Sequence, residues 1–211
     1  MSIDEQRERM VSEQLAARGI VDPRVLAACL RVPRHVFVPE AAQDQAYADH
    51  PVSIGGGQTI SQPFMVALMT QSLRLQGHER VLEVGTGSGY QLAILSELAL
   101  EAYSVERLPE LASLAAARLE RLGCLNAHVN VSDGWAGWPA VAPYDGIVVT
   151  AAADRIPEAL IAQLGEGGRL VMPVGSRDAQ TLLRVEKRGG RLQTEQLTSC
   201  VFVPLVGGEG A

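Results

Sequence analysis

A chain of 211 residues is long enough for one α/β domain with a full hydrophobic core and short for two, so we expect a single domain over residues 1–211. Hydrophobic residues make up 47% of the chain and charged residues 20%, which excludes an intrinsically disordered protein. The net charge of −6 is spread along the sequence without a basic face, and this argues against a nucleic-acid partner.

The sequence also argues against a membrane or metal-binding protein. Its first ten residues, MSIDEQRERM, are charged, and no run of about 18 apolar residues follows that could span a bilayer. We therefore expect a cytoplasmic protein. Cys29, Cys124 and Cys200 are widely spaced, and the four histidines are equally scattered. These spacings predict reduced thiols and no metal site.

The first 60 residues predict a helical cap. One helix is expected over 4–18, ended by Gly19, and a second over 23–31 with Pro23 in its first turn. An irregular segment rich in proline follows. We expect 1–60 to form a helical cap and substrate-side segment, and 61–211 to form an α/β core.

A β/α alternation begins near residue 80. Short apolar runs of strand type occupy 80–84, 102–106, 127–131, 145–150 and 169–174. Helical patterns follow Pro63 and separate the first three strands, with apolar positions at Val66, Met69 and Leu73, at Tyr90, Ile94 and Leu98, and at Leu111, Leu114, Leu119 and Leu122. Strands separated by helices predict right-handed crossovers and a mainly parallel sheet.

The end of the sheet should differ from its beginning. Two further strands are expected over 180–186 and 196–205, with the turn Gly189–Gly190 between them. This connection is too short for a crossover helix, so it predicts a C-terminal antiparallel hairpin.

The stretch VLEVGTGSGY, residues 81–90, carries the main chemical signal. Gly85, Gly87 and Gly89 follow a strand and open a helix, where glycines permit positive φ and let a ligand approach the backbone. The spacing G-x-G-x-G is one residue shorter than a dinucleotide fingerprint. Glu83 precedes the loop, and its carboxylate would disfavour a pyrophosphate and favour a cationic amine.

Two further acids lie at strand ends. Glu106 follows the second strand, where its carboxylate could accept hydrogen bonds from both hydroxyls of a ribose, and Asp133 follows the third, where it could accept one from an exocyclic amine. An amine, a ribose and an adenine in that order describe S-adenosyl-L-methionine. The alternative is that both acids only cap the helices that follow them.

The stretch IGGGQTISQP, residues 54–63, places three glycines before two hydroxyl side chains. As a pattern it is also compatible with a flexible surface hinge whose hydroxyls cap the helix after Pro63.

Taken with several other motifs, these residues resemble the bacterial protein-L-isoaspartate (D-aspartate) O-methyltransferases. The resemblance covers almost the whole chain, through VPRHVFVPE (32–40), AYADHPVSIGGGQTISQPFMVALMT (46–70), VLEVGTGSGYQ (81–91), YSVE (103–106), DG (133–134), VTAA (149–152) and FVPLVGG (202–208). It differs at Val52–Ser53, where the family more often has Leu–Pro. The resemblance implies a Rossmann-like, class I S-adenosylmethionine-dependent methyltransferase fold whose last strands are ordered differently from those of most relatives.

The resemblance also implies roles for individual residues. Ser61 corresponds to the residue that the family treats as its active-site serine, and we expect it to orient the substrate carboxylate. The expected cofactor-binding residues are Thr59, Ser61, Glu83, Gly85, Thr86, Gly87, Gly89, Glu106, Asp133 and Gly134. The expected substrate-binding residues are Thr59, Ile60, Ser61, Thr150, Val203, Pro204 and Leu205.

The implied reaction is methylation of the α-carboxylate of L-isoaspartyl residues in damaged peptides and proteins, leading through a succinimide to aspartate. A carboxylate is already ionised at pH 7, so its methylation needs no general base. We expect isoaspartyl proteins as partners and a monomer. Alternatives are a methyltransferase with a small-molecule acceptor, a non-catalytic module that recognises isoaspartyl sites and, more distantly, a nicotinamide-dependent dehydrogenase.

Overall fold

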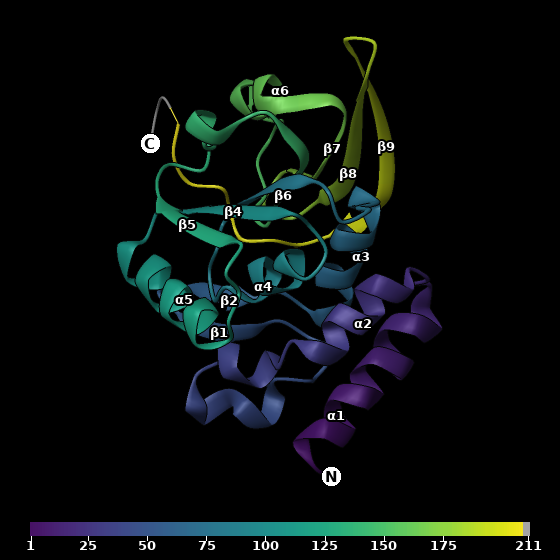
Figure 1. Ribbon diagram of the computed structural model, residues 1–211, viewed down its shortest axis with the longest axis vertical. Coiled ribbons are helices and arrows are strands. Elements are labelled where there is room, and N and C mark those ends of the chain that lie inside the picture. Colours follow the sequence, from purple (N-terminus) through teal and green to yellow (C-terminus); the bar gives the residue numbers. More distant parts are fainter. Residues whose placement is uncertain (209–211) are drawn as a thin grey trace.

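The computed structural model describes residues 1–208 and is built around one seven-stranded sheet (Figure 1). The strand order is β5-β4-β3-β6-β7-β8-β9. The strands are β3 (Arg80–Val84), β4 (Glu101–Glu106), β5 (Ala127–Val131), β6 (Tyr144–Val149), β7 (Leu164–Gly175), β8 (Gln180–Arg188) and β9 (Arg191–Cys200). Strands β3 to β7 pair in parallel, whereas β7–β8 and β8–β9 pair antiparallel. The predicted fold class is confirmed.

Helices cover both faces of the sheet. They are α1 (Ile3–Arg9), α2 (Pro23–Arg31), α3 (Pro63–Leu73), α4 (Tyr90–Ser96), α5 (Pro109–Arg121) and α6 (Glu158–Gln163). In Figure 1 the first five lie on one side of the sheet and α6 on the other. Shorter 3₁₀ helices occupy Arg34–Phe37, Glu40–Gln45 and Pro139–Val141.

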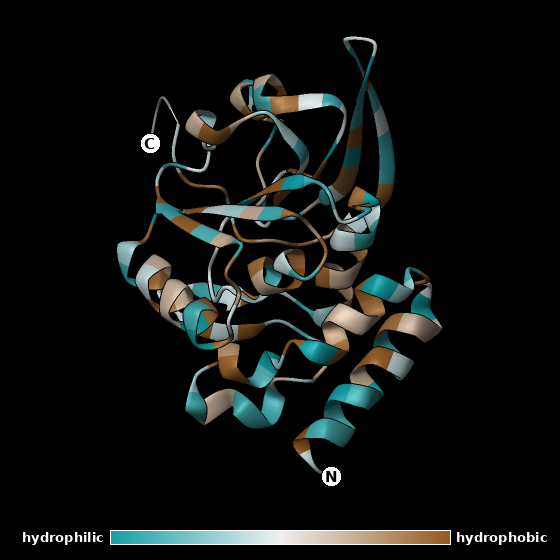
Figure 2. Ribbon diagram, in the orientation of Figure 1, coloured by the Kyte–Doolittle hydropathy of each residue, from teal (hydrophilic) through white to brown (hydrophobic). Residues whose placement is uncertain are grey.

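The N-terminal helix of the cap has the expected extent but is not uniform. Ser2 and Glu5 form a reciprocal capping box at its start. A π-helical stretch, Met10–Leu15, and a 3₁₀ turn, Ala16–Arg18, continue α1, and Gly19 ends the run with φ of +96°. In Figure 2 the α1 ribbon is mostly hydrophilic, and none of its seven residues is buried.

The cap shares its hydrophobic core with the sheet. One cluster of buried side chains includes Met10 and Phe37 from the cap together with Tyr90 and Val171 from the α/β core. A second cluster on the opposite face of the sheet gathers around Tyr144 and Leu160. The cap is therefore packed against the α/β core rather than joined to it by the chain alone.

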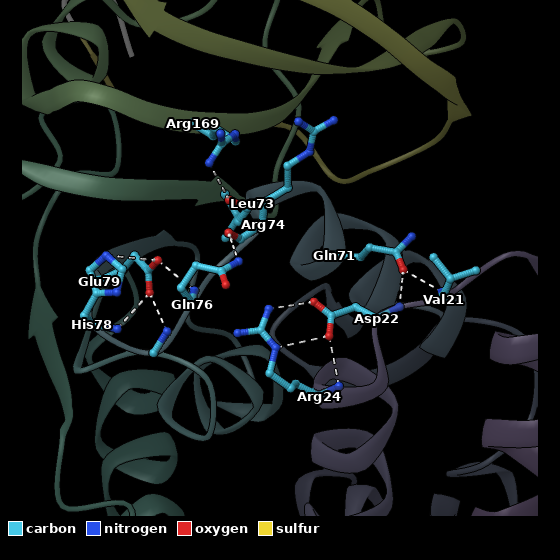
Figure 3. A network of polar contacts seen from close by, with 11 residues as sticks. Val21, Asp22, Arg24, Gln71, Leu73, Arg74, Gln76, His78, Glu79 and Arg169 are labelled. Carbon is cyan, nitrogen blue, oxygen red and sulfur yellow. Dashed lines mark hydrogen bonds and ion pairs between the residues drawn. The ribbon is translucent and has the colours of Figure 1, made fainter.

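Polar contacts at the C-terminal end of α3 reinforce this attachment (Figure 3). The Gln71 side chain accepts hydrogen bonds from the main-chain N–H groups of Val21 and Asp22, at 2.7 and 2.9 Å. Arg169 of β7 donates to the carbonyl of Leu73 at 3.4 Å. Helix α3 is thus held by the cap on one side and by the sheet on the other.

The structure corrects the predicted position of the last strand. It runs over Arg191–Cys200, not over 196–205. The turn Gly189–Gly190 has φ of +57° and +72°, which suits a two-residue hairpin turn, so pairing resumes at once between Arg188 and Arg191. The first six residues of β9 are exposed and polar in the main, which hid the strand from a reading based on apolar runs.

Four further elements differ from expectation. Helix α5 buries Leu111, Ala112, Ala115 and Leu119. The predicted positions Leu111 and Leu119 are therefore confirmed, whereas Leu114 and Leu122 are exposed and were wrong. Two short strands, β1 (Val52–Gly55) and β2 (Gln58–Ile60), form an antiparallel hairpin where we expected irregular chain. Helix α6 was not predicted.

Within residues 1–208 no helix is both long enough and apolar enough to cross a bilayer. In the same range no three His, Cys, Asp or Glu side chains are grouped as metal ligands would be.

Candidate active site

A cavity lies at the carboxyl ends of β3, β4 and β6. Strand β3 pairs with β4 on one side and with β6 on the other, so the strand order changes direction here. Ligands in open parallel sheets usually bind at such a point. Residues predicted from sequence that line it are Thr59, Ile60, Ser61, Glu83, Gly85, Thr86, Gly87, Glu106, Gly134, Thr150, Val203, Pro204 and Leu205. Gly89 and Asp133 are not among the lining residues.

The glycine loop after β3 depends on backbone that other residues rarely adopt. Gly85, Gly87 and Gly89 have φ of +97°, +51° and +90°. A Cβ atom at position 85 would lie 2.5 Å from Thr150 Oγ1, and one at position 89 would lie 3.1 Å from Ala115 Cβ. Gly85 and Gly87 therefore shape the cavity floor, and Gly89 allows α4 and α5 to pack closely.

Glu83 lies fully buried at the cavity floor. Ser104 Oγ donates to Glu83 Oε2 at 2.7 Å, and Thr86 Oγ1 lies 2.6 Å from Ser104 Oγ. Oε1 of Glu83 has no hydrogen-bond partner among the described residues. Burial raises the pKa of this carboxyl well above its usual range, while the Ser104 hydrogen bond opposes that shift. A buried acid with one free oxygen suits a cationic group as its partner.

Glu106 lies at the end of β4 and organises the loop around it. Its two carboxylate oxygens accept hydrogen bonds from Gly87 N–H at 2.9 Å and Leu108 N–H at 3.0 Å. The second contact is local, but it does not cap helix α5, whose N-cap residue is Leu108 and whose first turn has no side-chain cap hydrogen bond. Because each oxygen can accept more than one hydrogen bond, capacity for the hydroxyls of a ribose remains.

Asp133 lies beside the cavity and joins two segments that form its wall. Its carboxylate accepts from the N–H groups of Trp135 at 2.9 Å and Gly208 at 2.8 Å. Trp135 Nε1 donates to the carbonyl of Leu205 at 3.2 Å. Asp133 thus fixes the extended segment 201–208 against the loop after β5, and this contact had no counterpart in the sequence reading.

The segment 201–208 runs over the cavity as an extended strap. The carbonyl of Val203 accepts from Ala152 N–H at 2.8 Å, and Leu205 N–H donates to the Ala152 carbonyl at 2.7 Å. This parallel bridge joins the strap to the loop after β6. Three predicted substrate-binding residues, Val203, Pro204 and Leu205, therefore belong to the strap and not to the hairpin.

Ser61 follows β2 and is partly buried at the cavity wall. Its hydroxyl makes no hydrogen bond to another residue in the described chain, so it can bond to a ligand. Ile60 beside it is buried, whereas Thr59 is exposed at the rim. The glycine turn before them, Gly55–Gly57, has positive φ throughout and closes the β1–β2 hairpin.

Thr150 is committed to the glycine loop. Its hydroxyl donates toward the carbonyls of Gly85 at 2.8 Å and Val84 at 3.1 Å. It lines the cavity, but its donor is used within the protein.

Sequence reasoning missed Arg34, which is fully buried behind Ser61. Its Nη2 donates to the Ser61 carbonyl at 2.7 Å and its Nε to the Ala46 carbonyl at 2.6 Å. It lies within the motif VPRHVFVPE, quoted only for its family resemblance. It lies between Pro33 and His35, and these sequence neighbours gave no signal that its side chain would be buried.

These features fit one cofactor. The cavity combines a glycine loop at a strand end, a buried acid with a free oxygen, a second acid one strand away and apolar side chains such as Val105. The fold and the site define a class I S-adenosylmethionine-dependent methyltransferase.

Comparisons with known proteins narrow the class. Residues 5–210 match the family described as protein-L-isoaspartate(D-aspartate) O-methyltransferase, and the chain belongs to that family. A protein-L-isoaspartate O-methyltransferase of Methanoculleus marisnigri is 55% identical over 202 residues, covering 96% of this chain and 92% of the relative. One from Syntrophobacter fumaroxidans is 56% identical over 201 residues, covering 95% and 94%.

Solved structures agree with the sequence relatives. A beta-aspartate methyltransferase from Plasmodium falciparum, in complex with S-adenosyl-L-homocysteine, superposes with a TM-score of 0.84 at 27% identity and covers 95% of this chain and 98% of its own. A structure described as a protein-L-isoaspartate O-methyltransferase superposes with a TM-score of 0.86 at 30% identity, covering 96% of this chain and 66% of its own.

Proposed function

We propose that this protein repairs damaged proteins by transferring a methyl group from S-adenosyl-L-methionine to the α-carboxylate of L-isoaspartyl residues. The methyl ester cyclises to a succinimide, whose hydrolysis returns part of the product as aspartate. The observation that carries this proposal is the unbonded hydroxyl of Ser61 in the same cavity as the glycine loop and the extended strap.

The site is suited to a substrate that is already nucleophilic. A carboxyl group with a pKa of about 4 is already ionised at pH 7, so no proton has to be removed from it. The cavity lining contains no histidine. When bound, S-adenosylmethionine supplies an electrophilic methyl group. The chain's own task is to hold the carboxylate in line with that group and to exclude water, which can contribute several kcal/mol to lowering the barrier.

We assign the orienting role to Ser61. Its hydroxyl donates a hydrogen bond to one oxygen of the substrate carboxylate, so that the other oxygen points into the cavity. Glu83 and Glu106 bind the amine and the ribose of the cofactor, and the loop at Gly85 and Gly87 lets it approach the main chain.

Recognition of many different sequences calls for main-chain contacts, and the strap offers them. Val203 and Leu205 direct main-chain groups toward Ala152, so the carbonyl of Pro204 and the N–H of Val206 face the opposite way. Neither group is bonded within residues 1–208, and both residues line the cavity. An extended substrate peptide can pair with these two groups as an added strand.

The experiment that tests the function uses one synthetic peptide carrying L-isoaspartate and its twin carrying aspartate, with methyl-labelled S-adenosylmethionine. Label on the isoaspartyl peptide alone is the expected result. Cofactor binding without label on either peptide would favour a small-molecule acceptor or a non-catalytic recognition module. Label on both peptides would contradict the proposed selectivity for the extra backbone methylene.

Monomeric state and cytoplasmic location are part of the proposal and rest on the sequence. Sedimentation of the purified chain and fractionation of cells that express it test them directly.

A further inference from the structure

Arg34 is a charged side chain held entirely inside the protein. It starts the 3₁₀ helix Arg34–Phe37 and has no solvent exposure. Two main-chain carbonyls, those of Ala46 and Ser61, accept its hydrogen bonds, and its Nη1 atom has no partner among the described residues. A buried ion with an unbonded nitrogen strongly destabilises a protein, so structural support alone does not account for Arg34.

No acid compensates this charge. Among residues 1–208 no Asp or Glu oxygen lies within 4.0 Å of the Arg34 guanidinium. The titratable side chains that act on it are those of Cys29, Tyr47 and Tyr90. Burial raises the pKa of Cys29 to about 12 and that of Tyr90 well above its usual range, so both stay neutral near pH 7. Burial lowers the pKa of Arg34 from its ordinary value, but a guanidinium stays protonated in proteins, so its positive charge remains and no anion among residues 1–208 pairs with it.

The guanidinium lies directly behind the cavity wall. It bonds to Ser61, and its central carbon is 4.9 Å from the centre of the Tyr90 ring, a cation–π distance. Both Ser61 and Tyr90 line the cavity. Arg34 therefore lies directly against two residues of the cavity wall, and a charge buried away from water is weakly screened.

We propose that Arg34 is a specificity-determining and positioning residue, which fixes the main chain of Ser61 and supplies the positive charge that selects an ionised carboxylate at this site. The inference rests on the proposed function and extends it, because Ser61 then binds the carboxylate in a field that Arg34 sets.

The test separates charge selection from structural support. Dissociation constants are measured in the presence of S-adenosyl-L-homocysteine, so that no methyl transfer occurs, for the isoaspartyl peptide and for the same peptide with that α-carboxylate replaced by a carboxamide. The unaltered protein should prefer the carboxylate by about tenfold or more. Arg34→Gln should weaken binding of the carboxylate peptide by about that factor and leave the carboxamide peptide unchanged.

Two variants serve as controls. Arg34→Lys keeps the charge and should keep most of the preference, even where loss of one main-chain hydrogen bond lowers turnover. Arg169→Gln removes another arginine that donates to a main-chain carbonyl, that of Leu73 (Figure 3). Arg169 pairs with Glu186 at 3.0 Å and lies outside the cavity, so this variant should leave the preference intact.

Equal weakening of the binding of both peptides by Arg34→Gln would overturn the inference, because it would show that Arg34 only supports the structure. If Arg34→Gln does not fold, a preference near unity in the unaltered protein, or loss of the preference in Arg34→Lys, overturns it instead. Each result is distinct from failure of the proposed function, which shows as absence of methyl transfer to the isoaspartyl peptide by the unaltered protein.

Discussion

Gln180 at the start of β8 holds both main-chain polar groups of Phe202. Its Oε1 accepts from Phe202 N–H at 2.7 Å, and its Nε2 donates to the Phe202 carbonyl at 3.1 Å. Gln180 is buried, so these bonds are shielded from water. The Gln180 side chain therefore continues the hydrogen bonding of β9 at the point where the main chain leaves the sheet and becomes the strap.

Loss of this contact should loosen the strap without touching the glycine loop. Gln180→Leu leaves two main-chain groups of Phe202 unsatisfied, at a cost of about 1–3 kcal/mol in the free energy of unfolding. We expect the KM for the isoaspartyl peptide to rise several-fold while the Kd for the cofactor changes little. Denaturant unfolding and steady-state kinetics measure the two effects. An unchanged KM in a folded variant would show that the strap does not bind substrate.

Ser61→Ala tests the orienting hydroxyl. Because that hydroxyl bonds to no described residue, its removal should leave stability and cofactor affinity nearly unchanged. Turnover at saturating peptide should fall by about a hundredfold to a thousandfold, the range seen when one positioned donor is removed. Thr59→Ala, at the exposed rim, is the matched control and should cost less. Equal kcat in Ser61→Ala and the unaltered protein would remove Ser61 from the reaction.

Glu83 should make cofactor binding depend on pH. Its pKa is raised by burial, so the carboxyl of the ligand-free protein must lose a proton before it can pair with a cationic amine. We expect cofactor affinity to increase as pH rises through this elevated pKa, with proton release detectable by calorimetry in buffers of different ionisation enthalpy. Glu83→Gln should weaken binding and abolish the proton release. Glu101 is the first residue of β4, at the opposite end of that strand from the cavity. Glu101→Gln should therefore change neither cofactor affinity nor proton release.

The same group gives a stability change of known sign. A carboxyl whose pKa is higher in the folded than in the unfolded state contributes stability below the ordinary value of 4.5, and that contribution is lost as pH rises through the folded pKa. The free energy of unfolding of the ligand-free protein should therefore fall over this window. Glu83→Gln should flatten the slope, and an unaltered slope would mean that Glu83 is not responsible.

A pair of glycine substitutions separates backbone strain from a blocked site. Gly57 has φ of +71° and open space around it, so Gly57→Ala should cost only about 1–2 kcal/mol of left-handed strain. Gly85→Ala adds the same kind of strain and a Cβ atom 2.5 Å from Thr150 Oγ1. It should destabilise the protein further and reduce cofactor affinity at least tenfold by displacing the loop. Similar cofactor affinity in the two variants would contradict this role for Gly85.

Local patterns were sufficient for the parallel half of the molecule. Strand β3 and helix α2 occupy the predicted residues, because an apolar run and a proline in a first helical turn report directly on local structure. The edge strand β9 was displaced because half-exposed strands carry no apolar run. The β1–β2 hairpin was not predicted because its turn consists of three glycines, which also suit an irregular loop.

The candidate site follows the same division. Most cofactor and substrate residues predicted from motifs meet in one cavity, since strand ends on one edge of a parallel sheet converge. Asp133 lies beside it because its carboxylate is occupied with Trp135 and Gly208, contacts that join segments far apart in sequence. Arg34 was missed for a related reason. Nothing in a single sequence tells which surface-type residue is fully buried.

The polar character of β9 has a meaning beyond the position of a strand. It forms one edge of the main sheet, and Arg191, Gln193 and Glu195 along it are exposed. Charged edges discourage the addition of foreign strands, which is how β proteins avoid aggregation. The substrates of a repair enzyme are damaged and partly unfolded chains. We expect this polar sheet edge to keep the enzyme from pairing with the aggregates that such chains form, while the proposed main-chain pairing with substrate takes place at the strap (201–208).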